Sequence, residues 1–206
     1  FSGAFRDDLS RLMAWRRDVR RFRDDPVDEA SLARCLAAFA TAPSVGLSEP
    51  WRLIRVTSPA ARAAVRDNFS RANAEALAGY TGETAARYAG LKLSGMDKAP
   101  VQLAVFCDDE TPKGKGLGAR SMPEMRRYSV VSAITLMWLA ARAEGLGMGW
   151  VSILDPDRLA RDLAVPASWH LVGYLCLGYP ETQSDRAELE RLGWETRQGV
   201  PDLPER

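Results

Sequence analysis

One short basic segment, Arg16 to Phe22, offers the clearest chemistry in this sequence of 206 residues; it reads RRDVRRF. Its four arginines can surround a phosphate dianion with charge-assisted hydrogen bonds, although a solvated basic helix end would have the same composition. Asp18 stands among them, and beside a phosphate its carboxylate must point elsewhere because like charges repel. We expect the arginines to keep Asp18 ionised, which makes it a candidate general base or, alternatively, a partner in a structural salt bridge.

Ser152 is a second candidate for chemistry. It lies in the run WVSI, Trp150 to Ile153, where an expected strand approaches the start of a helix. Ligands in layered α/β folds commonly bind beyond such strand ends. The hydroxyl of Ser152, with nearby backbone amides, can orient a ligand or stabilise developing negative charge. A serine at a strand end is also common for structural reasons, and the residues alone leave both interpretations open.

Other common catalytic motifs are absent from the sequence. The glycines and lysines between Thr111 and Gly118 lack the GxxxxGK spacing of a nucleotide-binding P-loop, and no GxGxxG motif precedes them. His170 is the only histidine, and no cysteine or carboxylate lies at a spacing that suggests zinc. A Ser-His-Asp triad would have to use His170, yet no GxSxG motif accompanies it. We therefore expect no metal site and no serine-hydrolase chemistry.

The composition is that of a globular protein, with 46% hydrophobic and 27% charged residues. A net charge of +1 excludes a global field that would draw the protein to nucleic acid or a membrane surface, so we expect neither as a partner. No apolar stretch approaches the roughly 20 residues of a membrane span. Cys35, Cys107 and Cys176 form no CxxC pair, which is typical of free thiols in a reducing compartment. We expect a soluble, cytoplasmic protein.

The expected elements form a layered scaffold around these residues. Helical periodicity and capping signals predict helices over residues 6–15, from 28 to about 43, and over 125–145 and 156–163. Apolar runs predict strands over 51–57, 102–107, 149–154 and 169–177. Strands separated by helices indicate an α/β or α+β layer fold, and we expect residues 1–206 to form one domain.

Two segments are expected outside this scaffold. Residues 59–98 are helical in pattern but weakly amphipathic and interrupted by glycines, so about 70–98 suits a flexible cover better than a core element. Residues 181–206 are polar with scattered apolar anchors, which indicates a C-terminal arm.

Several segments together resemble the FMN-dependent nitroreductase family, over nearly the whole chain. RRDVRRF resembles its N-terminal RRSxRxF motif, which holds the FMN phosphate. Residues 43–51 resemble its PSSxNxQPW loop, in which a serine reaches the flavin. Residues 145–152 (GLGMGWVS) are similar to the glycine-rich entry to the strand over the flavin ring, and 177–180 (LGYP) to a strand end. Arg191 matches a C-terminal basic position that also reaches the phosphate.

The resemblance implies an α+β fold of three layers, with a mostly antiparallel central sheet flanked by helices. It also implies a homodimer that binds FMN at the subunit interface, with terminal arms that wrap the partner. The residues that match FMN-binding positions are Arg16, Arg17, Asp18, Val19, Arg20, Ser44, Leu93, Ser152 and Arg191.

The departures from the family pattern indicate one branch of it. Asp18 stands where ordinary nitroreductases carry serine, while Leu47 and Glu49 replace an asparagine and a glutamine of the loop. With residues 90–95, 99–108 and 123–129, they resemble a branch in which reduced FMN is a substrate and is broken down with dioxygen. In that branch, residues that match Asp18 and Ser152 are needed for the reaction. The reduced FMN then comes from a separate NAD(P)H-flavin reductase.

Two other functions remain open from the sequence. The first is an ordinary NAD(P)H-dependent FMN nitroreductase or a dehalogenase-like flavoenzyme. The negative charge of Asp18 argues against it, because a carboxylate does not help to bind a phosphate. The second is a non-catalytic flavin-binding protein, which would return FMN intact.

Overall fold

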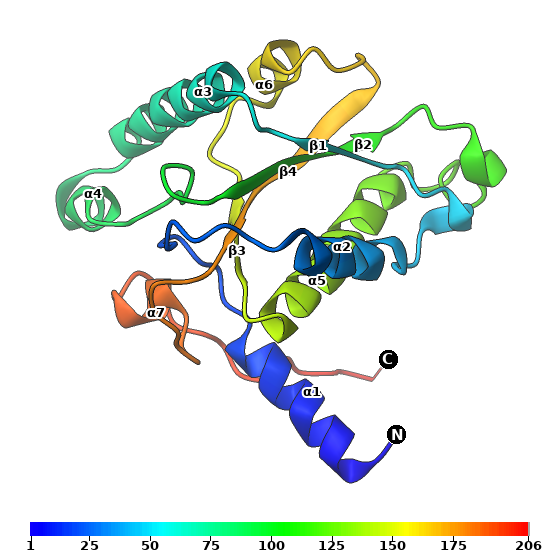
Figure 1. Ribbon diagram of the computed structural model, residues 1–206, viewed down its shortest axis with the longest axis horizontal. Helices are drawn as coiled ribbons and strands as arrows, with labels where there is room; N and C mark the ends of the chain where they lie inside the picture. The colour runs from blue at the N-terminus through cyan, green and yellow to red at the C-terminus, as the bar shows by residue number, and fades with distance from the viewer. Residues whose placement is uncertain (206) are drawn as a thin grey trace.

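One four-stranded sheet, in the order β1-β2-β4-β3, organises the fold, and each neighbouring pair of strands is antiparallel. The structure is a computed structural model that describes residues 1–205. The strands are β1 (Trp51–Arg55), β2 (Val101–Asp108), β3 (Gly147–Val151) and β4 (Trp169–Gly178). Helices lie on both faces of the sheet (Figure 1). The expected α+β fold of three layers with an antiparallel centre is confirmed.

Helices α2 (Glu29–Ala40) and α5 (Met125–Ala143) cover one face of the sheet (Figure 1). On α5, Ala133, Met137 and Ala141 recur four residues apart and are fully buried, as a core-facing helix requires. They pack in one cluster with Leu32 and Phe39 of α2. The long apolar pattern that predicted a helix from residue 125 thus gives the central helix of this layer. Asp28 caps α2 through the backbone N–H of Ser31, as its position in the sequence indicated.

The opposite face is covered by α3 (Pro59–Ala78) and α6 (Pro156–Asp162), with α4 (Gly82–Ala89) beside them (Figure 1). Of the residues of α3, only Val65 and Asn68 are buried. This agrees with the weak amphipathicity of the sequence there. After α4 the chain runs without regular structure to β2, and that stretch completes the segment expected as a cover. Its flexibility stays a prediction.

Three shorter or peripheral elements complete the chain. Helix α1 (Gly3–Trp15) projects from the body with the N-terminus, and none of its residues is buried (Figure 1). Two short 3-10 turns, η1 (Val45–Leu47) and η2 (Lys113–Gly116), lie in contact, and α7 (Glu188–Arg191) is the one helix beyond β4 in the described residues 1–205. Within the same described part of the chain, no helix is both long and apolar enough to cross a membrane.

The strand expected over residues 149–154 begins and ends earlier than predicted. β3 pairs with β4 from Gly147 to Val151, and Ser152 follows the last paired residue. Beyond this point the chain is bound from α3 by the buried side chain of Asn68. The amide oxygen of Asn68 accepts from the N–H of Asp155 at 2.8 Å, and its amide nitrogen donates to the carbonyl of Asp155 at 2.9 Å.

The basic segment lies along the outer edge of β3. The N–H of Val19 donates to the carbonyl of Met148 at 3.0 Å, and Asp18 forms a parallel bridge with Met148. This approach needs glycine, since a Cβ on Gly149 would lie 2.2 Å from the carbonyl oxygen of Val19. Phe22 then enters the core with no exposed surface and anchors the end of the segment.

We predict that Gly149→Ala displaces the basic segment from β3 and lowers the free energy of unfolding by about 1–3 kcal/mol, the usual effect of overpacking. Urea unfolding measures this change. The matched control is Gly199→Ala, since a Cβ at Gly199 meets nothing within 4 Å. Equal stability of Gly149→Ala and the unmodified chain would contradict the close approach.

Candidate active site

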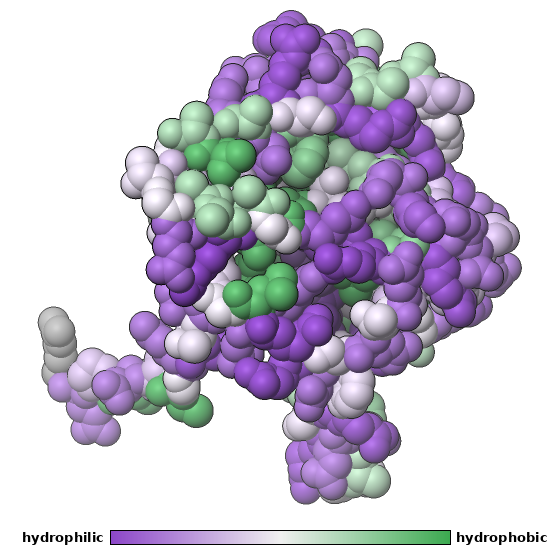
Figure 2. Space-filling view, turned by 90° about the vertical axis from the view of Figure 1, so that its left-hand side faces the viewer, coloured by the Kyte–Doolittle hydropathy of each residue, from purple (hydrophilic) through white to green (hydrophobic). Residues whose placement is uncertain are grey.

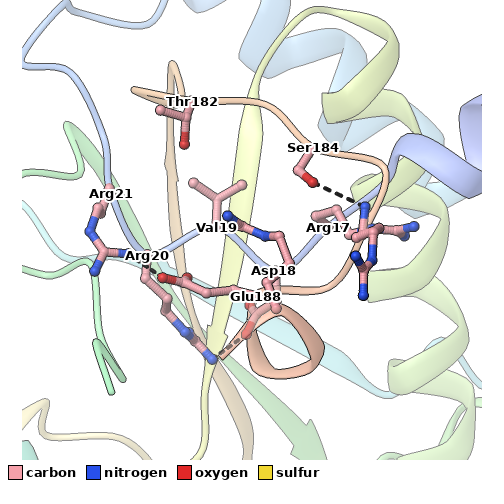
Figure 3. A pocket seen from close by; sticks show the side chains of 10 residues that line it. Arg17, Asp18, Val19, Arg20, Arg21, Thr182, Ser184 and Glu188 are labelled. Atoms are coloured by element: carbon pink, nitrogen blue, oxygen red, sulfur yellow. Dashed lines mark hydrogen bonds and ion pairs between the residues drawn. The ribbon is translucent and has the colours of Figure 1, made fainter. Parts of the chain in front are cut away.

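A pocket lined by five arginines lies between the basic segment and the C-terminal segment around α7 (Figure 3). We call it the arginine pocket, and its arginines are Arg17, Arg20, Arg21, Arg186 and Arg191. Asp18 and Glu188 are the carboxylates in its wall, and Thr182 and Ser184 add hydroxyl groups. Because the cations outnumber the carboxylates, the pocket suits an anion that carries more than one negative charge.

A second, more apolar pocket adjoins it. We call it the leucine pocket after Leu91, Leu93, Leu189 and Leu192, which line it with Ala187 and Lys92. The two pockets share Asp18, Arg20 and Glu188. In the space-filling view of the side that carries α4 and α7, apolar surface gathers in a hollow bordered by polar side chains (Figure 2). A ligand with an anionic end and an apolar body fits this combination.

The backbone of Trp150 holds Asp18 between the two pockets. The N–H of Trp150 donates to Oδ1 of Asp18 at 2.9 Å, and the carbonyl of Trp150 accepts from Nη2 of Arg20 at 2.9 Å. Arg20 also forms an ion pair with Asp18. The carboxylate is therefore fixed in direction, while 41% of its side-chain surface stays exposed to the pocket.

The surroundings of Asp18 raise the pKa of its carboxyl above the ordinary value. The expectation that the arginines keep Asp18 ionised stays a prediction. Desolvation by the surrounding protein is the largest cause, and the negative charge of Glu188 adds to it. Arg20, the N–H of Trp150 and Arg16 act in the opposite direction, as expected of cations and donors, but they do not outweigh desolvation. The sequence identified the charges correctly, but it did not show that desolvation outweighs them at a carboxyl that stays partly exposed.

Two buried donors of the arginine pocket have no hydrogen-bond partner within residues 1–205: Nη1 of Arg20 and Nε of Arg17. Other nitrogens of Arg17 donate to the carbonyls of Arg16 and Asp185. Buried donors without partners are unfavourable, and both belong to arginines that line the pocket, so an acceptor that reached them would relieve this cost.

The other residues that were predicted to bind FMN do not all line the same pocket. Val19 and Arg191 line the arginine pocket, and Leu93 lines the leucine pocket. Arg16 lines neither, since its guanidinium lies over the ring of Trp138, 4.7 Å from the ring centre. All their predicted roles in binding stay predictions.

Neither predicted serine lines the arginine pocket or the leucine pocket. Ser152 is exposed just beyond β3, two residues from the Trp150 that holds Asp18. Ser44 precedes η1, where its hydroxyl accepts from the N–H of Glu49 at 3.1 Å. This turn and α7 lie on opposite sides of the molecule (Figure 1). One chain therefore does not bring Ser44 to the arginine pocket.

The sequence did not identify the part of the site that the C-terminal segment contributes, apart from Arg191. The C-terminal segment folds back over the basic segment and adds four residues to the wall of the arginine pocket: Thr182, Ser184, Arg186 and Glu188. The N–H of Glu181 donates to the carbonyl of Arg21 at 3.1 Å and fixes this return. No local pattern in a polar tail specifies such a contact. Within residues 1–205, no group of three or more His, Cys, Asp or Glu side chains could hold a metal ion.

The family profile described as "Nitroreductase family" matches residues 13–179, and the chain belongs to that family. It is 55% identical to 5,6-dimethylbenzimidazole synthase of Rhodospirillum rubrum, over 98% of this chain and 95% of that protein. It is 51% identical to the protein of the same name from Rhodobacter capsulatus, over 95% of this chain and 94% of that one. The resemblance inferred from the sequence, to the family and to its branch, is confirmed.

Solved structures share the fold at much lower identity. The crystal structure of oxidized iodotyrosine deiodinase bound to FMN and 3-iodo-L-tyrosine matches with a TM-score of 0.73 and 21% identity. The match covers 96% of this chain and 97% of that one. At this identity the likeness shows the fold alone.

We predict that Asp18→Asn stabilises the fold at neutral pH. Because the folded-state pKa of Asp18 is raised, ionisation of its carboxyl disfavours the folded state at pH values above that pKa. Below the unfolded pKa of about 3.9, both states are protonated and the penalty disappears. The gain from Asp18→Asn should therefore be present at pH 7 and shrink as the pH falls through the folded-state pKa.

Urea unfolding at neutral pH and near pH 4 measures this difference. Asp7→Asn, on the exposed surface of α1, removes the same charge and serves as the control. A variant of Asp18 that is less stable than the unmodified chain at pH 7 would show that its ion pair with Arg20 outweighs desolvation.

Proposed function

We propose that this chain fragments reduced FMN with dioxygen to form 5,6-dimethylbenzimidazole, the lower ligand of cobalamin, and erythrose 4-phosphate. One observation carries the proposal: Asp18, in place of the usual serine, is fixed by Trp150 at the junction of an arginine pocket and an apolar pocket. The names of the relatives that are 48–55% identical support it. They do not favour a nitroreductase or a non-catalytic flavin-binding protein.

The arginine pocket fits the phosphate of FMN. Nη1 of Arg20 and Nε of Arg17 supply buried donors that need an acceptor, and Arg191 adds positive charge. Charge-assisted hydrogen bonds to a dianion are stronger than neutral ones, so this end of the ligand sets its position. Arg16 lies outside the pocket wall and contributes through its charge.

Asp18 is suited to remove a proton from the ligand. Phosphate binding in the arginine pocket would place the sugar chain of FMN along the shared wall that Asp18 forms. A raised pKa makes a carboxylate a stronger base, and its contacts with Trp150 and Arg20 fix its orientation in the pocket wall. Reduced FMN, when bound, supplies the electrons that reduce dioxygen and the carbon atoms of the benzimidazole.

Ser152 and the leucine pocket serve the flavin end of the ligand. The hydroxyl of Ser152 lies beyond β3, where it can hydrogen-bond a flavin edge or dioxygen held near Trp150. The leucine pocket, with Leu93, limits access of water to the reacting atoms. The cover formed by about residues 70–98, which includes Leu91 and Leu93 of this pocket, would also exclude NAD(P)H. A separate NAD(P)H-flavin reductase therefore supplies the reduced FMN.

We infer a homodimer in which Ser44 of one copy reaches the flavin held by the other. Members of the family are commonly homodimers. Helix α1 supports this arrangement, since Phe5, Leu9 and Met13 recur four residues apart on it and are 39–48% exposed. An apolar stripe on a projecting helix with no buried residue needs a partner surface to be stable in water.

The proposal predicts that the protein, mixed with chemically reduced FMN in air, releases 5,6-dimethylbenzimidazole that mass spectrometry detects. Asp18→Asn is nearly isosteric and should bind FMN yet form none. Recovery of intact oxidised FMN with the unmodified protein would favour a non-catalytic flavin-binding protein. Steady consumption of NADH with a nitroaromatic substrate would instead favour a nitroreductase.

Arg20→Ala should weaken FMN binding, because it removes a charge-assisted hydrogen bond worth about 1.5–3 kcal/mol, or about a 10- to 150-fold rise in Kd. Fluorescence titration of FMN measures the change. Arg161→Ala, on α6 outside both pockets, is the control that removes one arginine elsewhere. An unchanged Kd for Arg20→Ala would place the phosphate away from the arginine pocket.

A further inference from the structure

Glu188, the first residue of α7, lies in the wall of both the arginine pocket and the leucine pocket. Its carboxylate forms an ion pair with Arg21, and only 21% of its side-chain surface is exposed (Figure 3). An acidic side chain directed at an arginine in a pocket suited to a phosphate is unexpected, since it occupies a cation that the phosphate would use. Neither the binding of FMN nor the role of Asp18 requires it.

Glu188 places a negative charge in the wall of both pockets. It is one of two carboxylates in the wall of the arginine pocket, and Asp18 is the other. Desolvation is the main cause of the raised pKa of Asp18, and the negative charge of Glu188 adds a smaller contribution in the same direction. A phosphate that enters the pocket must therefore approach Glu188 as well as the arginines.

We propose that Glu188 competes with the phosphate of the ligand for Arg21 and so keeps the affinity of the pocket for phosphate groups low. The inference rests on the proposed function in one respect. In that reaction the substrate, reduced FMN, and the sugar product, erythrose 4-phosphate, both carry the phosphate. Binding energy that substrate and product share does not accelerate the reaction, and an excess of it slows release. The product has lost the flavin ring and is held by its phosphate end, so weaker phosphate binding lets it leave.

A purely structural role for the Arg21–Glu188 pair is the alternative, but the C-terminal segment has other anchors. Arg17 donates to the carbonyl of Asp185, and Arg87 donates to the carbonyl of Gly193 at 2.9 Å. The ring of Trp194 packs on the rings of Tyr80 and Tyr88, with centres 5.8 and 6.1 Å away. Neutralising Glu188 should therefore leave the segment in place.

The test is the affinity of Glu188→Gln for inorganic phosphate and for FMN, measured by isothermal titration calorimetry. Because the pair is partly exposed, we expect both ligands to bind about two- to fivefold more tightly than to the unmodified protein. Riboflavin, which lacks the phosphate, should bind with unchanged affinity. Unchanged or weaker binding of phosphate by Glu188→Gln would overturn the proposal.

Two controls separate competition for Arg21 from a general loss of negative charge. Glu181→Gln removes the same charge from the same segment but lines neither pocket, and it should leave phosphate affinity unchanged. In an Arg21→Ala background, Glu188→Gln should give a clearly smaller gain, because the group for which Glu188 competes is gone and only direct repulsion of the phosphate is relieved. An equal gain in that background would also refute the proposal. None of these binding measurements needs turnover, so a failure to form benzimidazole would sink the proposed function alone.

Discussion

The site depends on one set of contacts: the N–H and carbonyl of Trp150 with the side chains of Asp18 and Arg20. β3 is an edge strand, and an exposed edge leaves backbone groups that need partners. Here the partners are a carboxylate and a guanidinium, which an ion pair also joins. The same contacts that satisfy the sheet edge fix the direction of the carboxylate, so stability of β3 and geometry of the site have a common origin.

The composition of β3 follows from this arrangement. Gly149 lets the backbone at Val19 approach the strand, and a side chain there would separate Asp18 from Trp150. The protein around the carboxylate partly desolvates it, and this desolvation determines the direction of its pKa shift despite two cations nearby. The direction of the pKa shift of Asp18 thus depends on desolvation more than on the charges in the basic segment.

The sequence predicted what depends on local pattern and on family motifs, and it failed where distant segments meet. Periodicity and caps located α2, α5 and α6, and the basic segment was identified by composition alone. The end of β3 was misplaced: its pairing with β4 stops at Val151, and the following segment is bound to α3 through Asn68 and Asp155, a long-range contact that no local pattern indicates. The wall formed by residues 182–188 was missed because its position is set by long-range contacts in a polar segment without periodicity.

The cover and the C-terminal arm, expected as separate features, are in contact. Trp194 packs on Tyr80 and Tyr88, so the arm is tied to α4 and to the end of α3. The same arm carries Glu188 and Arg191 into the arginine pocket and Leu189 and Leu192 into the leucine pocket. The two pockets therefore take part of their walls from the same segment of the chain. A displacement of α7 would change the walls of both pockets together, because Glu188 lines both and its neighbours on α7 line one or the other.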